Sequence, residues 1–176
     1  MKKLICLILA ALAAFNLVAC GGGAAADNNT DNGNQNGNTP VAATDGYVFK
    51  YNGTEIAMHA EAAPIIKALG EPKSYSEEAS CAFTGLDKTY FYGSFYLQTY
   101  PVGDKDYVFG VWFADDSVQT NEGVYVGMAQ ADVEAVYGAD SYNGTNAYLL
   151  TKGMSKLTVI IKDGAVSSVQ YDAVVE

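Results

Sequence analysis

The chain has 176 residues, a formal net charge of −10 and no arginine. These values argue against nucleic-acid binding, because that function needs a basic surface and usually arginine to hydrogen-bond bases and phosphates. Of the three cysteines, only Cys81 lies in the expected folded part of the secreted chain, so we expect no intrachain disulfide.

Residues 1–19 are predicted to form a lipoprotein signal peptide. Two lysines precede an apolar run over residues 4–14, which is typical of a secretory signal. A membrane-spanning helix is the alternative, but it needs roughly 20 apolar residues. Residues 17–20, Leu-Val-Ala-Cys, resemble the lipobox of bacterial lipoproteins. The resemblance implies cleavage before Cys20, acylation of that cysteine and a lipid anchor on the extracytoplasmic face of the cell membrane.

Residues 20–45 are predicted to be a flexible tether behind the lipidated cysteine. They are rich in glycine and asparagine and show no apolar periodicity. Such a composition buries too little apolar surface to offset the entropy of ordering. A coil of about 25 residues spans roughly 27 Å, so we expect the folded part to stay near the membrane.

One folded domain is expected over residues 46–176, built from two tandem repeats at about 54–120 and 121–176. Ile56–Gly70 and Val124–Gly138 align at a constant offset of 68. Each reads as a short β segment, a helix with an apolar stripe, and a glycine that stops the helix.

Strand-like runs are predicted before the first helix and after both. The runs are Tyr47–Tyr51, Thr54–Met58, Lys88–Pro101, Tyr107–Ala114, Ala147–Lys152, Lys156–Lys162 and Ala165–Val174. Asn52-Gly53 and Asp163-Gly164 are predicted hairpin turns. Because no crossover helices separate these strands, the sheet should be antiparallel. The predicted class is therefore α+β, with the two repeats forming one sheet and both helices packed on one face.

Residues 127–138 carry a further resemblance. Their sequence, Gly-Met-Ala-Gln-Ala-Asp-Val-Glu-Ala-Val-Tyr-Gly, is similar to a helix signature of two groups. One is the outer-membrane assembly lipoproteins of the SmpA/OmlA (BamE) type, and the other is the tandem-repeat β-lactamase inhibitor proteins, whose disulfides this chain lacks. Residues 80–90 and 99–101 resemble lipoproteins of Gram-positive anaerobes, a resemblance that implies no particular activity.

The tyrosine pattern gives the main candidate binding surface. Alternate residues of a strand face opposite ways, so Phe95 and Leu97 suit a core and the residues between them suit a solvated face. Tyrosine and tryptophan are enriched at binding interfaces. The alternative is that these tyrosines are half-buried strand residues with no partner. The predicted binding residues are Tyr90, Tyr92, Tyr96, Gln98, Tyr100 and Trp112.

Catalytic and metal motifs are missing from the sequence. It has no phosphate loop, HExxH, GxSxG or CxxC, so we expect a non-enzymatic protein without cofactor or metal. Cys81 is expected to be buried as a small hydrophobe, with a redox or mixed-disulfide role as the alternative, and a dyad with His59 is the least favoured. The acidic pairs, such as Asp104 and Asp106, are expected in solvated turns or, as the alternative, in a weak cation site.

The sequence thus predicts a lipid-anchored, extracytoplasmic binding module that uses an aromatic sheet face. Its partner would be a protein, cell-wall material or a small ligand, and not nucleic acid. The alternatives are an inhibitor of an extracytoplasmic hydrolase, an envelope assembly factor and a carboxylate-based enzyme.

Overall fold

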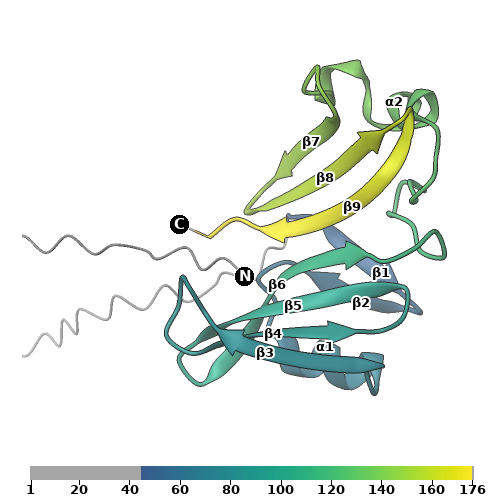
Figure 1. The fold of residues 1–176 in the computed structure, drawn as a ribbon. Helices are drawn as coiled ribbons and strands as arrows, with labels where there is room; N and C mark the ends of the chain where they lie inside the picture. The colour runs from purple at the N-terminus through teal and green to yellow at the C-terminus, as the bar shows by residue number, and fades with distance from the viewer. Residues whose placement is uncertain (1–44, 176) are drawn as a thin grey trace, which may run out of the picture. The chain divides into compact units, whose positions relative to one another are not determined.

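A computed structural model describes residues 45–175, and Figure 1 traces their path. The predicted signal peptide, Cys20 and the tether up to residue 44 lie outside the described residues. Strand pairing takes in about 50% of the structure and helices about 15%. The fold is therefore mostly β, and the predicted α+β class of tandem helix-plus-strand repeats is wrong.

The described elements are nine strands, two α-helices and one short 3₁₀ helix. In chain order they are β1 (Val48–Tyr51), β2 (Thr54–Ala57), α1 (Ala62–Leu69), β3 (Ser74–Ala79), β4 (Leu86–Phe91), β5 (Phe95–Val102), β6 (Lys105–Phe113), α2 (Gln130–Tyr137), η1 (Ala139–Ser141), β7 (Ala147–Lys152), β8 (Ser155–Lys162) and β9 (Ala165–Ala173). No helix among them is long and apolar enough to span a bilayer.

Seven of the strands form one antiparallel sheet in the order β3-β4-β5-β6-β9-β8-β7, and β1 and β2 pair separately. The predicted hairpin turns at Asn52-Gly53 and Asp163-Gly164 are confirmed. Asn52 has φ 48° and Gly53 φ 81°. Positive φ at both central residues is the signature of a type I′ turn, whose twist matches that of the flanking strands.

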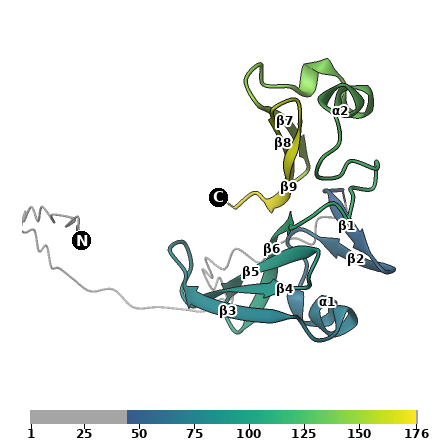
Figure 2. The same ribbon diagram turned by 45° about the vertical axis from the view of Figure 1, so that its right-hand side comes forward.

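The hydrophobic core lies against one face of the seven-stranded sheet. In Figure 2, α1, the β1–β2 hairpin and α2 all lie to the right of this sheet. Phe49 of the hairpin is fully buried, and its ring centroid lies 5.1 Å from that of Phe95 and 5.2 Å from that of Phe113. Ile65 of α1 and Val133 of α2 join the same core. Aromatic packing between the hairpin and the sheet therefore forms much of the interior.

The two helices begin and end 68 residues apart, but their surroundings differ. A paired hairpin precedes α1, whereas the matching stretch before α2 makes only an isolated bridge between Gln119 and Tyr125. Gly123 and Gly127, with φ 93° and 95°, turn the chain on both sides of that stretch and prevent a strand. Four strands follow α1 and three follow α2. Helices of eight residues are too short to form a layer of their own. The strands, with their alternating aromatic and β-branched residues, therefore determine the fold class.

Candidate functional site

The second face of the seven-stranded sheet, which we call the open face, carries no helix or hairpin formed by residues 45–175 (Figure 2). Directly opposite residues form two rows that each cross all seven strands. The aromatic row is Ser74, Phe91, Tyr96, Trp112, Gln170, Thr158 and Leu149. The polar row is Ser76, Thr89, Gln98, Gly110, Asp172, Lys156 and Thr151.

Three aromatic residues lie side by side at the centre of the aromatic row. The rings of Phe91 and Tyr96 are stacked, with centroids 4.6 Å apart and an interplanar angle of 24°. Trp112 lies directly opposite Tyr96 on the next strand. Tyr96 is 37% exposed, and the other two are half-buried. The faces of the Phe91 and Tyr96 rings therefore pack against each other, and Tyr96 is the most exposed of the three aromatic residues.

The polar row has a gap at Gly110. A Cβ atom at this position would lie 2.7 Å from the backbone oxygen of Tyr171 and 3.3 Å from Oδ1 of Asp172. The strands β6 and β9 approach too closely there for any side chain. The bare backbone consequently separates Gln98 from Asp172 across the row.

Asp172 is the single carboxylate in the two rows. Gln170 Nε2 donates a hydrogen bond to Asp172 Oδ1 at 2.7 Å. Burial raises the pKa of Asp172, while the hydrogen bond from Gln170 and the positive charge of Lys156 oppose this shift. Lys156 lies directly opposite Asp172 in the register. The two rows thus carry one negative and one positive group, and they have no net charge.

The structure brings only three of the six predicted binding residues together. Tyr96, Gln98 and Trp112 lie on the open face. Tyr90 lies opposite Leu97 on the core face. Tyr92 is 9% exposed, and its ring is stacked on that of Phe95 at 5.3 Å. The sequence pattern treats β4 and β5 as one continuous strand, in which every second residue lies on the same face. The turn between them interrupts this alternation, so even-numbered residues before and after the turn lie on different faces.

Tyr100, the remaining predicted residue, follows a register shift between Gln98 and Thr99 and is 3% exposed. Its hydroxyl lies 2.8 Å from His59 Nδ1, and His59 Nε2 lies 2.9 Å from the carbonyl oxygen of Met154. Because a carbonyl only accepts, Nε2 donates to it, and in the neutral ring Nδ1 accepts from the tyrosine hydroxyl. Burial raises the pKa of Tyr100 to about 12. His59 therefore links three segments, and Tyr100 is its buried partner and no surface contact.

A small cavity of about 160 Å³ lies beside this network. Tyr100, Phe83, Phe109 and Val175 give it mainly apolar walls, and Gln98 of the polar row also lines it. Cys81 is at its rim and is exposed, so the expected burial of this thiol is wrong. The loop between β3 and β4 holds Cys81 away from the core. The structure does not pair it with His59.

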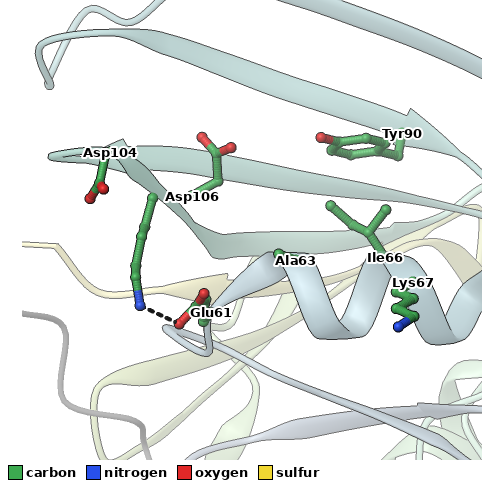
Figure 3. Close-up of a pocket in the computed structure, with 8 residues that line it drawn as sticks. Glu61, Ala63, Ile66, Lys67, Tyr90, Asp104 and Asp106 are labelled. Carbon is green, nitrogen blue, oxygen red and sulfur yellow. Dashed lines mark hydrogen bonds and ion pairs between the residues drawn. The ribbon is translucent and has the colours of Figure 1, made fainter.

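A second hollow lies between α1 and the strands on the core side of the sheet (Figure 3). It has a volume of about 410 Å³, and Ile66 and Tyr90 form its apolar wall. Lys105 Nζ lies 2.8 Å from Glu61 Oε2 at its mouth. Asp106, which also lines it, is 2.6 Å from Lys88 Nζ. These carboxylates are held in ion pairs, and no cluster of three potential metal ligands occurs in residues 45–175.

Sequence reasoning missed part of the open face. Phe91, Gln170 and Asp172 were not among the predicted residues, yet they adjoin Tyr96 and Trp112. The sequence does indicate that Gln170 and Asp172 lie on a solvated face, because the polar residues Ser168, Gln170 and Asp172 alternate within Ala165–Val174. The adjacency of β9 to β6 was the missing information, since the two strands are far apart in sequence.

Comparisons with known proteins add little to this description. No protein-family model matches the sequence, and no curated protein matches it. One solved structure is similar, an extracellular protein containing a SCP domain from Bacillus anthracis str. Ames. Its identity is 12% and its TM-score 0.41, with 70% of this chain and 47% of that chain covered. The chain thus spans about half the length of that protein, and a likeness this distant carries no argument about function.

Proposed function

We propose that this chain is a lipid-anchored, extracytoplasmic lipoprotein that acts as a non-enzymatic binding module through its open face. The sequence supports the anchor, because residues 17–20 resemble a lipobox and a segment rich in glycine and asparagine follows Cys20. The binding role rests mainly on one observation, the aromatic and polar rows that share the open face. Tethering near the membrane raises the effective concentration of the module toward an envelope partner.

The composition of the open face favours recognition over simple strand packing. Tyrosine and tryptophan bring large contact area with little rotamer entropy, which is why they dominate many binding surfaces. Here they occupy neighbouring strands, and amide side chains flank them on the same face. Residues that served only to cover a core would lie on the opposite face.

The binding role is tested with the double substitution Tyr96→Ala and Trp112→Ala in the full chain. Retention of envelope material by the immobilised protein should be lost, while the circular dichroism spectrum stays unchanged. Tyr125→Ala is the matched control, because Tyr125 is 39% exposed and Tyr96 is 37% exposed. Equal retention by the double variant and the control would refute the binding role of this face.

The anchor is tested separately with Cys20→Ala. The unmodified chain should fractionate with membranes, and the variant should be released into the aqueous fraction. Membrane association of the variant equal to that of the unmodified chain would refute acylation at Cys20.

A further inference from the structure

The cavity of about 160 Å³ beside Tyr100 adjoins the polar row of the open face at Gln98. Strand residues Asp87, Gln98, Tyr100 and Phe109 line it together with three residues of the β3–β4 loop. In another protein, an apolar cavity of about 150 Å³ takes up benzene, so this one has room for a group of about six non-hydrogen atoms.

Two local features of the fold give the cavity its apolar walls. The Phe83 ring of the β3–β4 loop packs on that of Tyr100, with centroids 4.8 Å apart. In β6 the register shifts opposite Gln98 and Thr99, which leaves Phe109 as an extra residue without a directly opposite partner in β5. Such a bulge changes the direction of side chains, and Phe109 lines the cavity together with Gln98 of the open face.

Asp87 is the one charged residue that lines this cavity. Its Oδ1 atom is buried, and no residue among 45–175 offers it a hydrogen bond. Glu78 lies directly opposite Asp87 in the pairing of β3 with β4, and like charges in this position are destabilising. The three ion pairs formed by residues 45–175 include neither carboxylate. A cation in the cavity would therefore offset both the repulsion and the unpaired buried oxygen.

The remaining lining groups indicate what kind of cation the cavity suits. A calcium or magnesium ion needs several oxygen ligands, and no cluster of three potential metal ligands occurs in the described part of the chain. A primary ammonium has three N–H donors to satisfy, whereas the walls are mainly apolar and the Tyr100 hydroxyl is already bonded to His59. A quaternary ammonium has no N–H group, and its methyl groups suit apolar walls.

We infer that the cavity binds a small quaternary ammonium group, with its methyl groups against Phe83, Tyr100 and Phe109 and its charge near Asp87. This site goes beyond the proposed function and does not depend on it. No residue of the aromatic row lines the cavity, so the cavity and the aromatic row can be tested separately.

Choline is the probe, and its neutral isostere is the dimethylbutanol in which a carbon atom replaces the nitrogen. Isothermal titration calorimetry of the full chain in a maltoside detergent, which carries no ammonium group, should show saturable binding of choline. The isostere keeps the shape but loses the charge, so it should bind roughly tenfold more weakly. Ethanolamine, a primary ammonium, should also bind more weakly. The Kd of choline should rise with ionic strength.

Matched variants locate the binding. Asp87→Asn keeps the shape of the side chain and removes its charge, so it should raise the Kd of choline roughly tenfold. Phe83→Ala removes part of the apolar wall and should also raise the Kd. Asp116→Asn is the control, because Asp116 is exposed and does not line the cavity, and it should leave the Kd unchanged. Circular dichroism checks that every variant is folded.

Cys81 provides a second measurement at the cavity itself, because it lies at the rim and is exposed. Bound choline should change the rate at which iodoacetamide labels this thiol, and the change should saturate with the Kd found by calorimetry. Mass spectrometry of the peptide that contains Cys81 separates it from the other two cysteines of the chain.

Several outcomes would overturn the inference. Absence of saturable choline binding, or equal affinity for the neutral isostere, would refute a quaternary ammonium as the ligand. Equal effects of Asp87→Asn and Asp116→Asn would reduce the binding to general attraction by an acidic surface. Choline binding that leaves Cys81 labelling unchanged would place the ligand outside the cavity. The double variant Tyr96→Ala and Trp112→Ala should keep the Kd of choline, so loss of envelope retention in that variant leaves this inference intact.

Discussion

The two faces of the seven-stranded sheet differ although their residues alternate along the same strands. On the core face, one row crosses the sheet through Leu97, Val111, Tyr171 and Leu157, all at most 1% exposed. One residue away on each strand, the open face has Tyr96, Trp112, Gln170 and Thr158. Both rows lie on the same strands, so the difference in burial comes from which side chains each face carries and what covers that face. Stability should therefore depend on the first row and recognition on the second.

The largest effect is expected from paired substitutions in β5. Leu97→Ala should reduce the free energy of unfolding by about 2–5 kcal/mol, because it leaves a cavity in a fully buried site. Gln98→Ala, its neighbour on the open face, should change it by less than about 0.5 kcal/mol. Chemical denaturation measures both. Similar losses in the two variants would remove the division of labour between the faces.

The next largest loss of stability is expected at Gly110, where strands β6 and β9 lie too close together for a side chain. Gly110→Ala would bring a Cβ to 2.7 Å from the carbonyl oxygen of Tyr171, so the β6–β9 junction must shift. We expect a loss of about 1–3 kcal/mol, as for other overpacked sites.

Thr158→Ala, in the aromatic row, is the control for Gly110→Ala, because it adds no atoms, and it should be nearly neutral. Denaturant midpoints of the two variants give the comparison. A Gly110→Ala protein as stable as the unmodified chain would show that the junction is looser than the structure describes.

The alternation of residues within strands predicted much of both faces. It correctly placed Phe95 and Leu97 in the core and directed Tyr96 and Trp112 away from it. The two hairpin turns were also predictable, because an Asn-Gly or Asp-Gly pair favours positive φ at both positions. These features depend on neighbours in sequence, which is why the sequence alone reveals them.

The remaining features depend on contacts between distant segments. The pairing of β6 with β9 brings Gln170 beside Trp112, and no local pattern encodes that adjacency. Strand β3 was missed because all six of its residues are exposed at the sheet edge, so it lacks the apolar alternation of a buried strand. Internal similarity at the helices misled the choice of class, since the strands around them differ.

Tyr100 offers a sharper test, because it follows Gln98 by two residues in β5 and yet is buried. Tyr100→Phe should cost about 1–3 kcal/mol, since His59 Nδ1 loses its 2.8 Å hydrogen bond in a buried site. Urea denaturation near neutral pH measures this loss. Unchanged stability would mean that the hydroxyl makes no net contribution.

The pH dependence of the same variant is also predictable. The pKa of Tyr100 is raised from 10.0 to about 12 in the folded protein, so the unfolded chain loses this proton first as the pH rises. The stabilising contribution of Tyr100 is full below pH 10 and is lost as the pH rises toward about 12. The unmodified chain should lose more stability over this interval than Tyr100→Phe. Other tyrosines titrate in both proteins, so the difference between the two pH profiles isolates Tyr100.

The smallest effect is expected at Cys81, just beyond the buried Tyr100 network. Its thiol is exposed in the β3–β4 loop, so a thiol reagent should label it in the native protein without denaturant. Cys81→Ser should abolish this labelling and change stability by less than about 0.5 kcal/mol. If Cys81 were labelled only after unfolding, its thiol would be buried, and the β3–β4 loop would belong to the core. Rapid labelling with unchanged stability would confine the core to the face that α1, the β1–β2 hairpin and α2 cover.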